Sequence, residues 1–243
     1  MTNHFKKFIY LIVFAVSLTS SLAASADDAV SFFRAVRADN GSGVKSMIGD
    51  GFDPNTKDPN GQTALLLALR EPSPKVIEVL LASPKVNIDA RNAADETPLM
   101  MAALKGNVEL ASKLIARDAD INKPGWTPLH YAATSGNIPI IKMLLDKDAF
   151  INSQSPNGTT PLMMAAMYGT SDAVKLLLEE GADPLMKNQL DMSATDFATK
   201  ASRPDAIQMI GAAVTEAQQK AAAGDKQAKP PAPAPTEAPA APQ

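Results

Sequence analysis

The chain of 243 residues carries a formal net charge of −3, from 23 basic and 26 acidic residues, and it has no cysteine. The length allows one or two domains, and so small and mixed a charge does not indicate a nucleic-acid partner. The absence of cysteine excludes disulfides, thiolate metal sites, a cysteine nucleophile and a lipidated cysteine anchor.

Residues 1–26 have the layout of a secretory signal peptide. Lys6 and Lys7 precede an almost wholly apolar run over residues 8–18, and Ala24 and Ala26 then form an A-x-A arrangement. The run is shorter than the roughly 20 residues of a membrane-spanning helix. We therefore expect cleavage after Ala26, no membrane anchor in the mature protein and a periplasmic location, with secretion as the alternative.

The middle of the chain repeats itself. The segments "TALLLAL", "TPLMMAA", "TPLHYAA" and "TPLMMAA" begin at Thr63, Thr97, Thr127 and Thr160, and a divergent copy, "SATDFAT", begins at Ser193. The spacings are 34, 30, 33 and 33 residues. A period near 33 residues indicates a repeat architecture.

Each copy contains the same end signals for two helices. Glycine stands nine residues after the threonine in three copies, at Gly106, Gly136 and Gly169. Glycine can adopt positive φ there and end a short helix. Residues that favour helix N-caps follow directly: Asn107, Asn137 and Thr170. A second helix is therefore expected after each turn.

The second helix of each copy has an apolar stripe. The stripe contains Ile140, Ile141, Leu144 and Leu145 in one copy and Ala173, Val174, Leu177 and Leu178 in the next. These spacings place the side chains on one helical face. A single unit cannot bury such a face alone, so the units are expected to stack into a continuous core.

The segment "GWTPLHYAATSGNIPIIKMLLDKDAFIN" resembles an ankyrin repeat, and the resemblance extends from about Asp28 to Val214. It implies an all-α solenoid of stacked helix-turn-helix units with β-hairpin or loop fingers. Two departures stand out: Asp95 replaces the usual turn glycine, and the loop before Thr127 is about three residues short. A shortened finger is expected there.

The resemblance and the composition together divide the chain. We expect a signal peptide at 1–26, an N-terminal capping repeat at 27–60, full repeats at 61–94, 95–124, 125–157 and 158–190, and a C-terminal cap at 191–214. The Ala- and Pro-rich residues 215–243 contain no large apolar side chain and are expected to be disordered.

His130 and the methionines are the candidates for chemistry. A catalytic histidine requires a nucleophile or an orienting acid, and no such set can be assembled around His130. The family resemblance instead implies that its imidazole braces the turn. Met101 and Met164 could suggest a Cu(I) site, but they share a repeat column with Leu67 and Tyr131, which favours packing. We therefore predict no catalytic, cofactor-binding or metal-binding residue.

The resemblance implies a concave groove that binds a protein partner. The partner-binding residues expected on this basis are Arg91, Glu96, Lys105, Trp126, Gln154, Asn157, Met167 and Tyr168. Trp126 has two interpretations: an exposed anchor of the interface, or a side chain that fills the gap of the shortened finger.

The sequence thus predicts an exported, monomeric scaffold without enzymatic activity or cofactor. It would bind a protein, and not nucleic acid, as an accessory or protective factor for another periplasmic protein. One alternative is a secreted effector that binds a host protein. Another, from a different class, is a metal-binding or enzymatic protein that uses His130 and the methionines.

Overall fold

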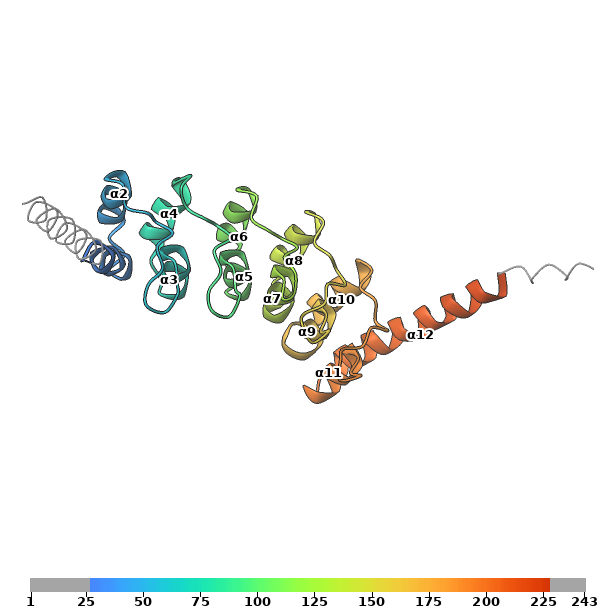
Figure 1. The fold of residues 1–243 in the computed structure, drawn as a ribbon. Coiled ribbons are helices and arrows are strands. Elements are labelled where there is room, and N and C mark those ends of the chain that lie inside the picture. The colour runs from blue at the N-terminus through green and yellow to red at the C-terminus, as the bar shows by residue number, and fades with distance from the viewer. Residues whose placement is uncertain (1–26, 228–243) are drawn as a thin grey trace, which may run out of the picture.

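The computed structural model describes residues 27–227 and shows an array of helical pairs (Figure 1). A helical segment over residues 27–37 precedes α2 (Gly41–Gly49). The following pairs are α3 (Ala64–Arg70) with α4 (Pro74–Ala82), α5 (Pro98–Leu104) with α6 (Val108–Ile115), α7 (Pro128–Ser135) with α8 (Ile138–Leu145), α9 (Pro161–Tyr168) with α10 (Ser171–Glu179), and α11 (Ala194–Lys200) with α12 (Pro204–Gln227). The predicted all-α repeat solenoid is confirmed. The predicted signal peptide and residues 228–243 lie outside the described residues.

The helices form two rows. The first helices of the pairs, α3, α5, α7, α9 and α11, lie side by side in one row, and the second helices form the other (Figure 1). The core runs continuously between the rows and includes Leu99, Leu129 and Leu162 from first helices and Leu144 and Leu177 from second helices, all of them buried. Stacking therefore buries the apolar face that each pair would otherwise expose.

Local signals explain where the helices begin. Thr97, Thr127 and Thr160 precede a proline at the first helical position, where the missing N–H costs nothing. The second helices begin at the predicted N-caps: side-chain oxygens of Asn107, Asn137 and Thr170 accept hydrogen bonds from the first turn of α6, α8 and α10.

The predicted turn glycines have two different roles. Gly106 and Gly136 both have φ of 65°, as expected for residues that end a helix in the left-handed region. The expectation is wrong at Gly169, whose φ is −78°. A Cβ at Gly169 would lie 2.3 Å from the Ala133 carbonyl oxygen. Glycine is therefore required there because α9 and α7 approach each other closely.

The loops after the second helices are tied to one another. Side-chain oxygens of Asn55, Asp89, Asn122 and Asn152 accept hydrogen bonds from the backbone N–H groups of Asn87, Asp120, Phe150 and Asp183 in the next loop. The fingers beyond these loops contain only isolated bridges, between Lys57 and Thr63 and between Lys187 and Ser193, within the described part of the chain. Of the two finger forms that were expected, irregular loops therefore describe these fingers better than β-hairpins do.

The last helix is longer than the sequence predicted. α12 continues to Gln227, so the expected disorder from residue 215 is wrong for residues 215–227. Ala206 and Ile210 anchor the helix to the array, and residues 218–223 are exposed. The high helix propensity of alanine, glutamine and lysine explains the extension. No helix within residues 27–227 combines the length and apolar character needed to cross a membrane.

Candidate functional site

A pocket opens between the first helices in the middle of the array. Its volume is about 260 Å³, and it is lined by Leu104 of α5, Trp126 of the finger before α7, His130, Tyr131 and Thr134 of α7, and Met164 of α9. We call it the first-helix pocket. Leu104 is 45% exposed, and Tyr168, one turn beyond Met164 on α9, is 57% exposed. Apolar and aromatic surface is therefore available to a ligand here.

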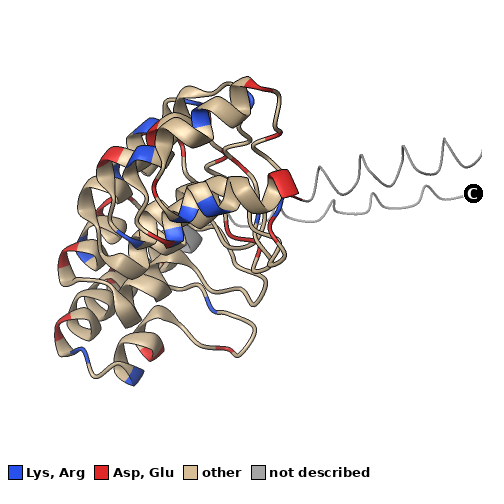
Figure 2. Ribbon diagram, turned by 90° about the vertical axis from the view of Figure 1, so that its left-hand side faces the viewer, with Lys and Arg blue, Asp and Glu red and all other residues tan. Residues whose placement is uncertain are grey.

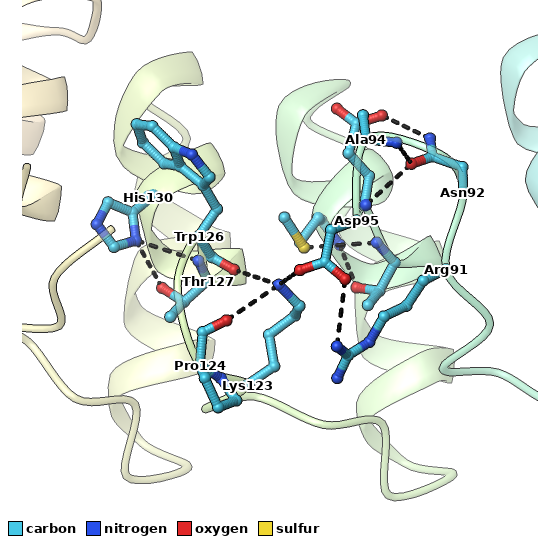
Figure 3. A network of polar contacts seen from close by, with 12 residues as sticks. Arg91, Asn92, Ala94, Asp95, Lys123, Pro124, Trp126, Thr127 and His130 are labelled. Carbon is cyan, nitrogen blue, oxygen red and sulfur yellow. Dashed lines mark hydrogen bonds and ion pairs between the residues drawn. The ribbon is translucent and has the colours of Figure 1, made fainter. Parts of the chain in front are cut away.

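His130 is held as a structural brace. Its Nε2 lies 2.9 Å from the Thr159 carbonyl oxygen, which can only accept, so Nε2 carries the proton. Its Nδ1 accepts hydrogen bonds from the Thr127 backbone N–H at 3.2 Å and from the Thr127 hydroxyl at 2.9 Å (Figure 3). Burial lowers the pKa of His130 to about 4. The prediction that this imidazole braces the turn is confirmed.

Methionine sulfur takes the same place in two sister repeats. Met100 Sδ and Met163 Sδ each lie 3.4 Å from the backbone N–H of Thr97 and Thr160, respectively. Both methionines are fully buried. These sulfur atoms therefore act as weak acceptors at the start of a helix, in place of the histidine nitrogen.

The shortened finger is built around Lys123. This lysine is fully buried, and its Nζ lies 2.6 Å from Asp95 Oδ2, 3.2 Å from the Pro124 carbonyl oxygen and 3.1 Å from the Trp126 carbonyl oxygen (Figure 3). Arg91 Nη1 lies 3.2 Å from the other Asp95 oxygen. The hydrogen bond from Lys123 is the main reason that the pKa of Asp95 is lowered.

Trp126 is neither a fully exposed interface anchor nor a side chain that fills the gap of the shortened finger, the two alternatives that the sequence left open. Its indole is partly buried and packs edge-on against the imidazole of His130, with ring centroids 5.2 Å apart and planes at 74° (Figure 3). Lys123, and not Trp126, occupies the interior of the shortened finger. One side of the indole therefore lines the first-helix pocket.

Glu96 contacts Tyr131, one of the residues that line this pocket. Its Oε1 accepts a hydrogen bond of 3.0 Å from the Tyr131 hydroxyl, and its Oε2 accepts one of 2.7 Å from Asn92 Nδ2. Burial is the main reason that the pKa of Tyr131 is raised, and the charge of Glu96 adds to this effect. Of the predicted partner-binding residues, the structure brings Glu96 and Trp126 together around Tyr131.

The other predicted residues are more dispersed. Met167 and Tyr168 lie at the end of α9, and Gln154 and Asn157 are exposed on the following finger. Lys105 Nζ donates to the carbonyl oxygens of Leu69 and Arg70 at the end of α3. Lys105 therefore caps the end of a neighbouring helix. Arg91 likewise forms an ion pair within its own finger, with Asp95.

Leu104, Tyr131 and Met164 line the pocket, although the sequence analysis did not place them on the binding surface. Leu104 stands seven residues after Thr97, the position that Thr134 and Met167 occupy in the next two repeats. The repeat register could therefore have predicted that Leu104 lies on the same surface. Tyr131 and Met164 were assigned to packing alone. They do pack against the core, but both remain partly exposed and reach the pocket.

In the view of Figure 2, basic and acidic positions within residues 27–227 are interspersed along the helices and loops. This side of the array therefore shows no extended region of one sign of the kind that attracts a polyanion.

Comparison with known proteins agrees with the fold. The family model "Ankyrin repeats (3 copies)" matches four overlapping stretches, 32–124, 73–155, 99–188 and 151–213. The chain is also similar to the human neurogenic locus notch homolog protein 4, with 34% identity over 86 residues. This match covers 35% of the present chain and 4% of the human protein. The chain therefore spans only a small part of that relative.

Proposed function

Because this chain belongs to the ankyrin-repeat family, we propose that it is a non-catalytic scaffold that binds a protein partner on the surface around the first-helix pocket. The single observation that carries the proposal is this pocket, whose lining includes the exposed Leu104. Tyr168, also exposed, follows the lining residue Met164 by one turn on α9. Trp126 and Tyr131 contribute aromatic surface to the same site, and such residues are enriched in interface hot spots.

The environment of His130 supports a role without catalysis. Both imidazole nitrogens are engaged in hydrogen bonds that hold backbone and hydroxyl groups, and the ring is buried. Within residues 27–227, no group of three or more histidine, aspartate or glutamate side chains is placed to hold a metal ion. A general base needs a nitrogen that can take a substrate proton, and both nitrogens of His130 are already engaged in hydrogen bonds.

Export and an accessory role complete the proposal. They rest on residues 1–26, which read as a signal peptide, and on the absence of cysteine. The protein would act in the periplasm, where it would hold or protect another exported protein. Cell fractionation tests this location: recovery in the cytoplasm with an intact N-terminus would refute it, and recovery in the medium would favour secretion.

Affinity capture tests the binding site. Tagged wild-type protein is compared with a Trp126→Ala, Tyr168→Ala double variant and with Phe150→Ala, which removes an aromatic side chain that is 65% exposed on a loop away from the pocket. We expect a partner that wild type and Phe150→Ala retain and that the double variant, at equal helicity, loses. A partner that all three proteins retain would place binding elsewhere.

A further inference from the structure

Glu96 differs from the other charged side chains near the first-helix pocket. Asp95 is neutralised by Lys123 and Arg91, and Lys105 donates to the carbonyl oxygens at the end of α3. Among the ion pairs within residues 27–227, none involves Glu96. Its carboxylate is fixed by two neutral donors, and no cation within residues 27–227 forms an ion pair with it.

The position of Glu96 connects its charge to the pocket. Glu96 and Trp126 occupy the same place in adjacent repeats, directly before Thr97 and Thr127. Tyr131 forms part of the pocket wall and its hydroxyl reaches the Glu96 carboxylate. Each oxygen of that carboxylate receives one hydrogen bond and retains capacity for another. The Glu96 carboxylate is therefore joined to the wall of the apolar pocket through the Tyr131 hydroxyl.

We infer that the first-helix pocket receives a basic side chain, lysine or arginine, of the protein partner. The apolar stem of such a side chain would lie along Leu104 and Met164, and its charge would lie beside Glu96. Long basic side chains bury their methylene groups on apolar surface while the charged head stays at a polar edge. The rings of Trp126 and Tyr131 add a favourable interaction with a cation.

The inference rests on the proposed function and specifies the partner's chemistry. An acidic anchor would be repelled by Glu96, and a purely apolar anchor would leave the carboxylate uncompensated when it is covered. A basic anchor satisfies both the pocket and the charge. Specificity at this site would thus come from one carboxylate and affinity from the aromatic and aliphatic surface.

The test uses immobilised pools of seven-residue peptides. The central residue is fixed as arginine, lysine, norleucine or glutamate, and the other positions are randomised. Norleucine retains the aliphatic stem of lysine without its charge. We expect the arginine and lysine pools to retain about tenfold more wild-type protein than the norleucine pool, and the glutamate pool to retain the least. Saturable changes in the emission of Trp126, the only tryptophan, should accompany binding.

Glu96→Gln should lower retention by the basic pools to the norleucine level. The matched control is Glu109→Gln, the same change at an exposed carboxylate on α6 that pairs with Lys113. Circular dichroism checks that both variants remain folded. If Glu96→Gln is unstable, salt provides a second measurement on wild type: high salt should reduce retention by the basic pools and leave the norleucine pool unchanged.

Equal retention of the norleucine and basic pools, an unchanged preference in Glu96→Gln, or no retention by the basic pools would each overturn the inference. Failure of the basic-anchor inference can be distinguished from failure of the proposed scaffold function. A native partner whose capture depends on Trp126 and Tyr168 but not on Glu96 would leave the scaffold proposal standing and remove the basic anchor.

Discussion

Lys123 Nζ lies 2.6 Å from Asp95 Oδ2, and the two residues come from successive fingers. Asp95 has φ of 61° and occupies a turn position that Gly61, Gly125 and Gly158 fill, at φ of 74°, 83° and 78°, in three other repeats. Asp191 takes the same position in the last copy, at φ of 58°. Lys123 lies in the shortened loop before Thr127. The pair therefore links two successive fingers through residues that are 28 positions apart in sequence.

Lys123→Met should destabilise the protein by about 2 kcal/mol. The variant keeps an aliphatic stem but loses the hydrogen bonds to the Pro124 and Trp126 carbonyl oxygens. The ion pair itself contributes less, because the Asp95 side chain is 56% exposed. Urea denaturation followed by circular dichroism measures the loss.

The matched control for that variant is Lys113→Met. Lys113 also lies 2.6 Å from a carboxylate, Glu109, but both side chains are exposed. No measurable loss is expected there. Equal free energies of unfolding for the two variants would show that the buried hydrogen bonds of Lys123 add nothing to stability.

His130 makes stability depend on pH between about 4 and 6.5. The unfolded state takes up a proton near the ordinary histidine value of 6.5, whereas the folded state does so only at about 4. The unfolded state therefore binds more protons in this window, and stability falls as the pH falls through it. The total loss is roughly 3 kcal/mol, since each pKa unit corresponds to about 1.4 kcal/mol.

His130→Met removes this pH dependence. Methionine is accommodated at this position in two sister repeats, where its sulfur accepts the threonine N–H. At pH 7 the variant should lose about 1 kcal/mol, because the hydrogen bond to the Thr159 carbonyl oxygen is absent. At pH 4.5 it should equal or exceed wild type. Parallel stability curves for the two proteins across this pH range would contradict the assignment of a neutral, buried imidazole.

Thr63→Val should leave stability unchanged or raise it slightly. Thr63 Oγ1 is buried and has no hydrogen-bond partner. Its desolvation therefore lowers the stability of the folded state, and no hydrogen bond offsets this loss. Thr127→Val is the contrasting change, because that hydroxyl contacts His130 Nδ1. We expect it to lose about 1 to 2 kcal/mol. Thermal unfolding of the two variants side by side decides the point; a larger loss in Thr63→Val would be inconsistent with the orphaned hydroxyl.

Leu144→Asp should destabilise the array by several kcal/mol. Leu144 is fully buried in α8, and the variant would place an unpaired charge between neighbouring helices. Leu190→Asp is the control, because Leu190 is 72% exposed and the same change should cost less than about 0.5 kcal/mol. Similar melting temperatures for the two variants would mean that the repeat register is wrong.

Much of the fold was readable from sequence because it depends on local interactions. At the N-caps Asn107 and Asn137, the side chain accepts a hydrogen bond from a backbone N–H three residues further along the chain. A period near 33 residues then places equivalent side chains in register. These features follow from residue type and spacing alone.

The tertiary structure decided what depends on contacts between repeats. The close approach of Ala133 determines the backbone at Gly169, and the reach of Lys123 to Asp95 leaves Trp126 against His130 at the pocket. Leu104, Tyr131 and Met164 meet only because three consecutive first helices stack. Repeat spacing specifies which helices are neighbours, but the space between their side chains depends on loop length and packing, which residue types alone do not determine.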